Sequence, residues 1–186
     1  MTQAQKDFIS KVGKSAAEAM ETSGVPASLI IAQAILESGW GKSGLTVKAN
    51  ALFGIKADSR WTGRVYSTNT KECYDGVNFT TVSALFRAYD SWEHSIADHS
   101  VFLCKNARYA EVIGEKDYKK ACAAIHASGY ATAPDYASKL ITIIEQYKLM
   151  EFDKGNVSGK ERHKMNLKTL LLTKNACYKA DRKSVV

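Results

Sequence analysis

Several features that would indicate other classes of protein are missing from this chain of 186 residues. No apolar run is long enough to cross a membrane, and the first residues lack the apolar segment of a signal peptide. The four cysteines form no CxxC pair and no regular pattern, so we expect them to be unpaired: Cys73, Cys104, Cys122 and Cys177. We therefore expect no membrane insertion, no disulfide scaffold, and a single domain with its own core.

Histidine is also scarce, and its spacing does not suit metal binding. His94 and His99 are five residues apart, which on a helix separates them by about 140°. His126 stands alone, and the chain contains neither an HExxH nor a Walker motif. We expect neither a metal ion nor another cofactor.

The net charge of +7 is concentrated at one end of the chain. Residues 1–153 contain 17 basic and 17 acidic side chains, whereas residues 154–186 contain nine basic and two acidic ones. A basic tail can touch nucleic acid or anionic wall polymers, but solvated linker charge is the better interpretation. We do not expect nucleic acid to be a partner of the neutral domain.

Hydrophobic periodicity predicts a mainly helical domain with a β-rich insert. The β-rich part contains an Asp75-Gly76 hairpin signal and predicts two or three strands, near residues 63–68, 71–75 and 78–88. Residues 43–56 look irregular or briefly helical. Helices are predicted at residues 3–22, between Pro26 and Gly39, at 92–104 after an Ser91 cap, at 117–127 and at 134–149. The fold class is therefore α+β with a small antiparallel lobe.

Glu37 occupies the last turn of the second predicted helix, directly before a turn with two glycines. It shares a helical face with Ile30 and Ala34, and poor solvation there disfavours a carboxylate. The negative end of the helix dipole disfavours it further. Both effects raise a pKa, as a general acid needs. On these grounds alone, a glutamate that simply points into water is an equally good interpretation.

Three stretches in consistent order resemble the glucosaminidases of glycoside hydrolase family 73, found in bacterial autolysins, phage lysins and the flagellar rod-cap hydrolase. They are Glu-Ser-Gly-Trp-Gly (37–41), Ala-Asn-Ala-Leu-Phe-Gly-Ile-Lys (49–56) and Ser-Gly-Tyr-Ala-Thr-Ala-Pro-Asp-Tyr-Ala (128–137). The resemblance covers roughly residues 1–150. It implies a lysozyme-like fold with Glu37 as the general acid.

The resemblance also implies a second catalytic group on the β-insert, where Glu72 lies in a Thr-Lys-Glu-Cys-Tyr stretch. Cys73 departs from the family's Thr-x-Glu-Tyr pattern, so Asp75 is an alternative second catalytic group. Without the resemblance, Glu72 would be interpreted as a solvated charge on a strand. The 2-acetamido group of the substrate is a third possible nucleophile. Tyr130 would then orient the acetamido group or the water, unless it is a core aromatic residue.

By the same resemblance, Asn50, Phe53 and Gly54 border the saccharide cleft, and Tyr136 is a further substrate-binding residue. Asparagine can bond sugar hydroxyl or acetamido groups, and glycine allows a close backbone approach. An aromatic residue beside a glycine turn is more often a packing residue, so we interpret Trp40 as structural.

The predicted domain organisation is a catalytic domain at residues 1–153 and a polar linker at 154–164. Residues 165–180 resemble, more weakly, the opening of the amidase domains that follow glucosaminidase domains in some lysins. Residues 165–186 are thus the truncated start of a second domain, or a disordered tail. A wall hydrolase without a signal peptide would be released by a phage-type membrane lesion, or would have had its signal removed.

The leading hypothesis is a monomeric endo-β-N-acetylglucosaminidase that cuts the GlcNAc–MurNAc β-1,4 bond of peptidoglycan. A muramidase or lytic transglycosylase is the alternative among enzymes, because lysozyme-like folds share a helix-end glutamate and a β-lobe. Transglycosylases can work with one acid, so an inert Glu72 would favour them. A non-catalytic wall-binding module is less favoured, because a binder has no use for a poorly solvated acid at position 37.

Overall fold

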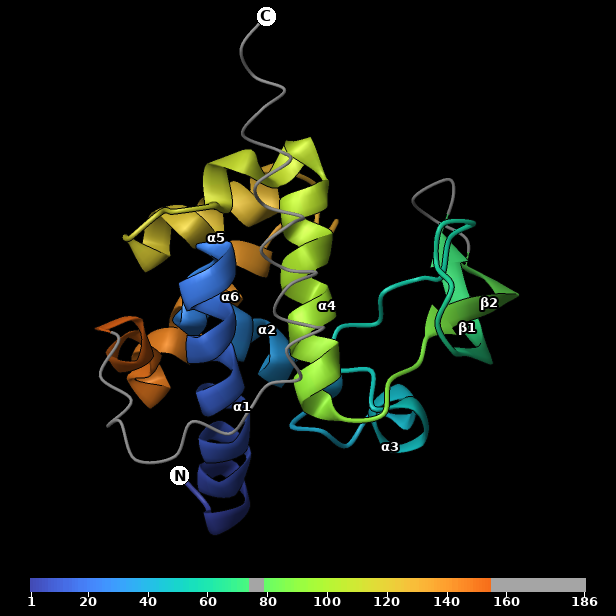
Figure 1. Ribbon diagram of the computed structural model, residues 1–186, viewed down its shortest axis with the longest axis horizontal. Helices are drawn as coiled ribbons and strands as arrows, with labels where there is room; N and C mark the ends of the chain where they lie inside the picture. Colours follow the sequence, from blue (N-terminus) through green and yellow to red (C-terminus); the bar gives the residue numbers. More distant parts are fainter. Residues whose placement is uncertain (74–78, 155–186) are drawn as a thin grey trace, which may run out of the picture.

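The structure is a computed structural model that describes residues 1–73 and 79–154. A helical body carries a two-stranded lobe at one side, with the short helix α3 (Gly44–Ala49) below that lobe (Figure 1). The α+β class and the helix positions predicted from periodicity are confirmed, with ends that agree within two residues. The body consists of α1 (Gln3–Ser23), α2 (Ala27–Ser38), α4 (Trp92–Lys105), η1 (Ala107–Val112), α5 (Tyr118–Ala127), α6 (Tyr136–Tyr147) and η2 (Leu149–Lys154).

Helix α2 is the most buried element of the helical body. Every residue from Ala27 to Ile35 is buried, and the helix contacts α1, α5, α6 and η2. A helix that is apolar on all sides is stable only when other elements surround it. Pro26 is its N-cap and provides no side-chain cap. Instead, Asp153 of η2 accepts a hydrogen bond of 2.8 Å from the Ser28 amide, so a distant segment caps α2.

The turn after α2 depends on its two glycines. Gly39 has a φ of 56° and ends the helix in the left-handed conformation, as the sequence predicts. Gly41 has a φ of 78°, and a Cβ atom there would lie 2.7 Å from the ring of Trp92. Trp40 packs edge-on against two core rings, those of Phe8 and Tyr147. This packing holds the last turn of α2, and Trp40 is structural as expected.

The lobe consists of β1 (Val65–Cys73) and β2 (Phe79–Arg87), paired antiparallel from Val65↔Arg87 to Cys73↔Phe79. The predicted break between residues 68 and 71 is wrong, because β1 runs through it. Threonine favours a strand, and the polar side chains there suit an exposed ladder. The hydroxyl groups of Ser67 and Ser83 are 3.2 Å apart across the strands. The predicted Asp75-Gly76 turn lies outside the described residues.

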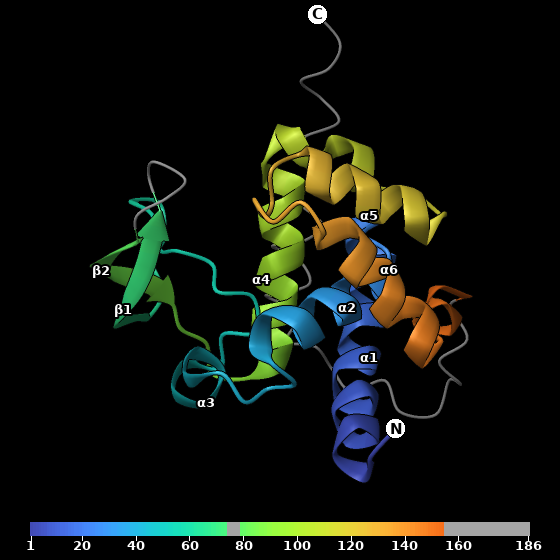
Figure 2. The same ribbon diagram turned by 180° about the vertical axis from the view of Figure 1, so that it is seen from behind.

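The lobe is joined to the body at its base (Figure 2). The Arg87 amide donates to the Ile55 carbonyl and the Tyr89 amide to the Ala49 carbonyl, each at 2.9 Å. The Arg87 guanidinium also pairs with Asp98 of α4, with Nη1 3.0 Å from Oδ2. The end of β2 is therefore tied both to the 49–56 segment and to α4 of the body.

Cys122 is buried and free, as predicted. Cys104 is disulfide-bonded, so the prediction that it is unpaired is wrong. Sequence spacing could not show this, since the tertiary fold decides which sulfur atoms meet. No helix in the described part of the chain is long and apolar enough to cross a membrane. Lys154 is the last residue of η2, and predictions for residues 155–186 lie outside the described residues.

Candidate active site around Glu37

Two hydrogen bonds link α2 and α6 at the position of the predicted acid. The Tyr136 hydroxyl donates to Oε1 of Glu37 at 2.8 Å. The Gln33 amide in turn donates from Nε2 to the Tyr136 hydroxyl oxygen at 3.1 Å. Gln33 and Tyr136 are both buried. Because Gln33 and Glu37 are four residues apart, they share one face of α2 and meet the same tyrosine.

The surroundings of Glu37 favour its protonated form. The side chain reaches solvent, but the protein packed around the carboxyl group removes part of its hydration. This desolvation raises the pKa of Glu37, and the hydrogen bond from Tyr136 lowers it by a smaller amount. The position at the C-terminal end of α2 acts in the same direction as desolvation. A carboxyl group in this setting can donate a proton at a higher pH than an ordinary glutamate.

A row of four rings connects the two other motif segments. Phe53 stacks on His99 with centroids 3.9 Å apart, and His99 meets Tyr130 edge-on at 5.9 Å. Tyr130 in turn stacks against Tyr136 at 5.9 Å. His99 is fully buried, and neither ring nitrogen has a hydrogen-bond partner in the described structure. Burial lowers the pKa of His99 to about 3, so the row is uncharged at neutral pH.

The predicted substrate-binding residues of the 49–56 segment have structural contacts of their own. Asn50 ends α3 with a φ of 52° and donates from Nδ2 to the Tyr89 and Asp90 carbonyls at 3.1 and 3.2 Å. The Phe53 side chain is buried. Gly54 is exposed and has a φ of 57°, a conformation that favours glycine. Of these three, Gly54 leaves the most surface open to a ligand.

The other predicted catalytic residues, Glu72 and Tyr130, lie in two different parts of the structure. Glu72 lies in β1, opposite Thr80 of β2, and so belongs to the lobe. Tyr130 lies between α5 and α6, on the body, and is partly buried against the core. Burial, with Tyr136 and Glu37 nearby, raises the pKa of Tyr130 well above its usual value, so its hydroxyl stays protonated. The structure thus gathers Glu37, Tyr130 and Tyr136 on the body.

Gln33 was missed by the sequence reasoning, although a signal was present. It is a polar residue inside the apolar run from Ile30 to Ile35, four positions before the acid. A polar side chain in a buried helix needs a partner, and residues four apart share a face. The spacing of His94 and His99 on a helix argues against a shared metal ion. No group of three or more potential ligands for a metal ion occurs among the residues that the structure describes.

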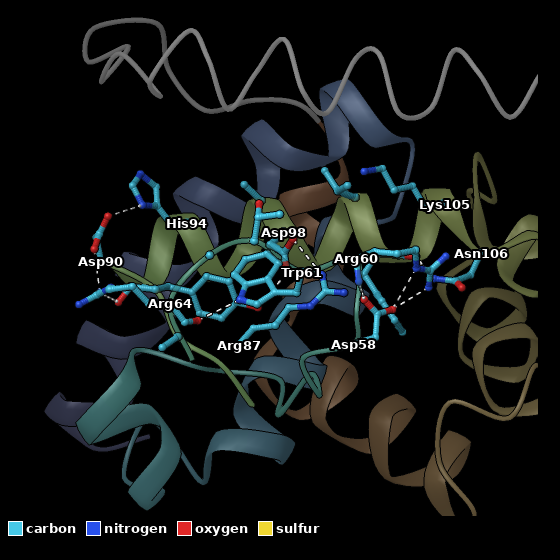
Figure 3. A pocket seen from close by; sticks show the side chains of 17 residues that line it. Asp58, Arg60, Trp61, Arg64, Arg87, Asp90, His94, Asp98, Lys105 and Asn106 are labelled. Carbon is cyan, nitrogen blue, oxygen red and sulfur yellow. Dashed lines mark hydrogen bonds and ion pairs between the residues drawn. The ribbon is translucent and has the colours of Figure 1, made fainter. Parts of the chain in front are cut away.

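A pocket of about 600 Å³ lies between α4, residues 58–64 and residues 87–90 (Figure 3). It contains none of the predicted site residues. The Arg87 guanidinium lies 4.7 Å from the centroid of the Trp61 ring while it pairs with Asp98. Two further arginines on its rim are also paired with aspartates, in Arg60–Asp58 and Arg64–Asp90. The three arginines of the pocket are thus each paired with an aspartate, and Arg87–Asp98 joins the lobe to α4.

A helical body with a small β-lobe and a partly desolvated acid at the end of a buried helix is the arrangement of a lysozyme-like glycoside hydrolase. Residues 13–149 match the family model Glucosaminidase, described as mannosyl-glycoprotein endo-beta-N-acetylglucosaminidase. The chain belongs to this family of glycoside hydrolases.

Relatives with known names support the same family. The chain is 39% identical over 150 residues to peptidoglycan hydrolase FlgJ of Salmonella typhimurium, covering 78% of this chain and 47% of that protein. It is also 39% identical over 161 residues to exo-glucosaminidase LytG of Bacillus subtilis, covering 84% and 56%. The chain thus spans about half the length of these relatives.

Solved structures confirm the fold. The catalytic domain of the autolysin Auto from Listeria monocytogenes superposes with a TM-score of 0.75 at 32% identity, over 82% of this chain and 89% of that one. A C-terminally truncated glycoside hydrolase domain of Salmonella typhimurium FlgJ has a TM-score of 0.63 at 37% identity, over 77% and 97%. An N-acetylmuramoyl-L-alanine amidase from Staphylococcus aureus has a TM-score of 0.71 at 33% identity, over 82% and 44%.

Proposed function

We propose that this chain is a peptidoglycan hydrolase that cleaves the GlcNAc–MurNAc β-1,4 bond, as an endo-β-N-acetylglucosaminidase. The observation that carries the proposal is the carboxyl group of Glu37, which has a raised pKa and accepts a hydrogen bond from Tyr136. The family match and the relative named peptidoglycan hydrolase support the substrate. The relative LytG is named an exo-glucosaminidase, so the length of the products is needed to distinguish endo-acting from exo-acting cleavage.

In the proposed reaction, Glu37 donates its proton to the glycosidic oxygen as the bond from that oxygen to C1 of GlcNAc breaks. The sugar ring then carries the positive charge of an oxocarbenium ion, and MurNAc leaves with a new 4-hydroxyl group. Water adds to C1, directly or after transient attack by the 2-acetamido oxygen, and gives up a proton to a base. The cycle closes when Glu37 takes up one proton and the base releases the proton that it received from water.

The remaining residues have supporting roles in this proposal. Glu72, which the β-lobe carries, stabilises the positive charge or activates the water. Tyr130 orients the acetamido group or the water from the body side, and Tyr136 positions the acid. Asn50, Phe53 and Gly54 form the neighbouring sugar-binding segment, in which Asn50 and Phe53 chiefly hold the exposed backbone of Gly54 in place.

The bond is tested by digestion of purified peptidoglycan followed by borohydride reduction and mass spectrometry. The proposal predicts reduced N-acetylglucosamine ends on products longer than a disaccharide at early times. Disaccharides alone from the first minutes would indicate an exo-acting enzyme. Reduced muramic ends would indicate a muramidase, and anhydro-muramic ends a lytic transglycosylase, and either would overturn the proposal. No release from several wall types would favour a non-catalytic wall-binding module.

The roles of the two glutamates are tested in the same assay with Glu37→Gln and Glu72→Gln. Loss of a general acid typically reduces the rate by about 10²–10⁴-fold, so Glu37→Gln should abolish measurable release. A comparable loss in Glu72→Gln would support a catalytic role on the lobe. Full activity of Glu72→Gln would assign the second function to the acetamido group or to Asp75, and Asp75→Asn would then separate those two.

A further inference from the structure

The hydrogen bonds around Tyr136 determine the direction in which its hydroxyl proton points. Gln33 is completely buried and Tyr136 is 3% exposed, so water does not compete for their polar atoms. The Gln33 amide nitrogen has only protons to offer, and it lies 3.1 Å from the Tyr136 oxygen. That oxygen is therefore an acceptor on one side. Its single proton remains for the 2.8 Å bond to Glu37.

We propose that Gln33 is a positioning residue for the acid: by donating to the Tyr136 oxygen, it directs the Tyr136 proton to Glu37 Oε1. Without that donor, the hydroxyl group can rotate about its C–O bond and offer its proton elsewhere. The printed hydrogen bonds of the Gln33 side chain reach Tyr136 and not the Glu37 carboxyl group, so the side chain acts through Tyr136. The inference rests on the proposed function, in which Glu37 is the general acid.

The other end of the Gln33 side chain supports this interpretation. Its carbonyl oxygen Oε1 is buried and has no hydrogen-bond partner in the described structure. A buried acceptor without a partner destabilises the fold, and an apolar side chain of similar size would avoid that loss. In the described structure the partner of this amide is therefore on its N–H side, at the Tyr136 oxygen.

The expected consequence is a change in the acidity of Glu37. A hydrogen bond to a carboxylate stabilises the charged form, and the bond from Tyr136 lowers the pKa that burial raises. The other titratable groups around this pair are Tyr130, beside the Tyr136 ring, and Cys122 and His126 on α5. None of them donates to Glu37 in the described structure. Loss of the Gln33 donor should therefore raise the pKa of Glu37.

The test uses Gln33→Met, Gln33→Glu, Tyr136→Phe and the double variant Gln33→Met with Tyr136→Phe. Methionine keeps the size of Gln33 but has no donor. Glutamate keeps its shape but adds a second carboxyl group near Glu37, so Gln33→Met alone isolates the loss of the donor. Tyr109→Phe is the matched control, because Tyr109 is a buried tyrosine whose ring contacts Tyr130. Circular dichroism and thermal unfolding show which variants remain folded.

Two readouts are recorded for each folded variant. The first is the titration midpoint of the Glu37 carboxyl carbon by ¹³C NMR. The second is the midpoint of the alkaline limb of the pH–rate profile on peptidoglycan. We expect both to move upward in Gln33→Met, Gln33→Glu and Tyr136→Phe, and to stay in place in Tyr109→Phe. The double variant should match Tyr136→Phe alone, since Gln33 acts through that hydroxyl. Thermal stability of Gln33→Met should equal or exceed that of the wild type.

Two outcomes would overturn the inference. The first is an unchanged Glu37 midpoint in Gln33→Met when Tyr136→Phe raises it. The second is an unchanged midpoint in both Gln33→Met and Tyr136→Phe, which would show that these hydrogen bonds do not set the acidity of Glu37. Failure of the proposed function looks different: the Glu37 midpoint moves as expected while the alkaline limb of the rate does not follow, which supports the role of Gln33 and removes Glu37 as the acid.

Discussion

The Tyr136 hydroxyl donates a hydrogen bond of 2.8 Å to Glu37, a residue 99 positions earlier in the chain. This contact exists because α6 packs against α2, with Tyr136 in the first turn of α6 and Glu37 in the last turn of α2. The tyrosine ring is buried while the carboxyl group beside it reaches solvent. A rigid donor thus holds an acid that a substrate can reach.

Glu37 should reduce the stability of the fold at neutral pH. Its pKa in the folded protein is raised above the usual 4.5, so the folded state binds this proton more tightly than the unfolded state. The proton bound to Glu37 therefore stabilises the folded state below pH 4.5. This stabilisation is lost as the pH rises through the folded-state pKa of Glu37. We expect the melting temperature of Glu37→Gln to equal that of the wild type near pH 4 and to exceed it at pH 7. A lower value at pH 7 would contradict this.

His99 should make the protein sensitive to acid. Its folded-state pKa of about 3 lies below the usual 6.5, so stability is lost as the pH falls below 6.5. The loss is at most about 1.4 kcal/mol per pH unit until the folded-state pKa is reached. His99→Phe keeps an aromatic ring on Phe53 and removes this titration. Urea unfolding at pH 7 and pH 5 should show a smaller loss for the variant, and equal losses would argue against a buried neutral imidazole.

The ion pair between Arg87 and Asp98 should be essential for attachment of the lobe. Their side chains are only 11% and 17% exposed, and Asp98 also accepts a 2.8 Å bond from the Tyr89 hydroxyl. Removing one partner of a buried pair leaves an uncompensated charge, so Asp98→Ala should cost about 3–5 kcal/mol in urea unfolding.

A control for this prediction is the exposed pair of Arg60 and Asp58, with side chains 82% and 39% exposed. Asp58→Ala should cost no more than about 1 kcal/mol. Replacing both members of the buried pair, by Arg87→Met with Asp98→Leu, should be less harmful than Asp98→Ala alone. Equal effects of Asp98→Ala and Asp58→Ala would show that burial does not matter at this joint.

Asp153 should stabilise α2 although it lies beyond the residues that match the family model, 13–149. Pro26 provides no cap, and Asp153 accepts from the Ser28 amide. Loss of a side-chain cap costs about 0.5–2 kcal/mol, so Asp153→Ala should lower the free energy of unfolding by that amount. Asp153→Asn should retain most of the stabilisation that the cap provides. Glu151→Ala, which removes an exposed partner of Lys154, is the control and should change little.

Local sequence signals predicted most of the secondary structure. Helix α2 could be placed because Gly39 and Gly41 end an apolar run, and the start of α4 because Ser91 caps it, accepting from the His94 amide. The position of Glu37 on α2 is equally local. Each of these signals is carried by residues within one or two helical turns.

Contacts between distant segments could not be predicted in this way. The bonds from Tyr136 to Glu37 and from Ser28 to Asp153 span 99 and 125 residues, and both depend on how helices pack. No local pattern encodes that packing. The ring contacts of His99 could not be predicted for the same reason, since Phe53 and Tyr130 reach it from separate segments.

The most direct test of the central claim, that Glu37 is the general acid, varies the leaving group. The wild type and Glu37→Gln are compared on a MurNAc–GlcNAc oligosaccharide and on the matching 2,4-dinitrophenyl glycoside, whose leaving group needs no proton. A general acid matters only for the first, where the variant should lose about 10²–10⁴-fold, and it should retain most of its rate on the second. Equal losses on both substrates would contradict the account.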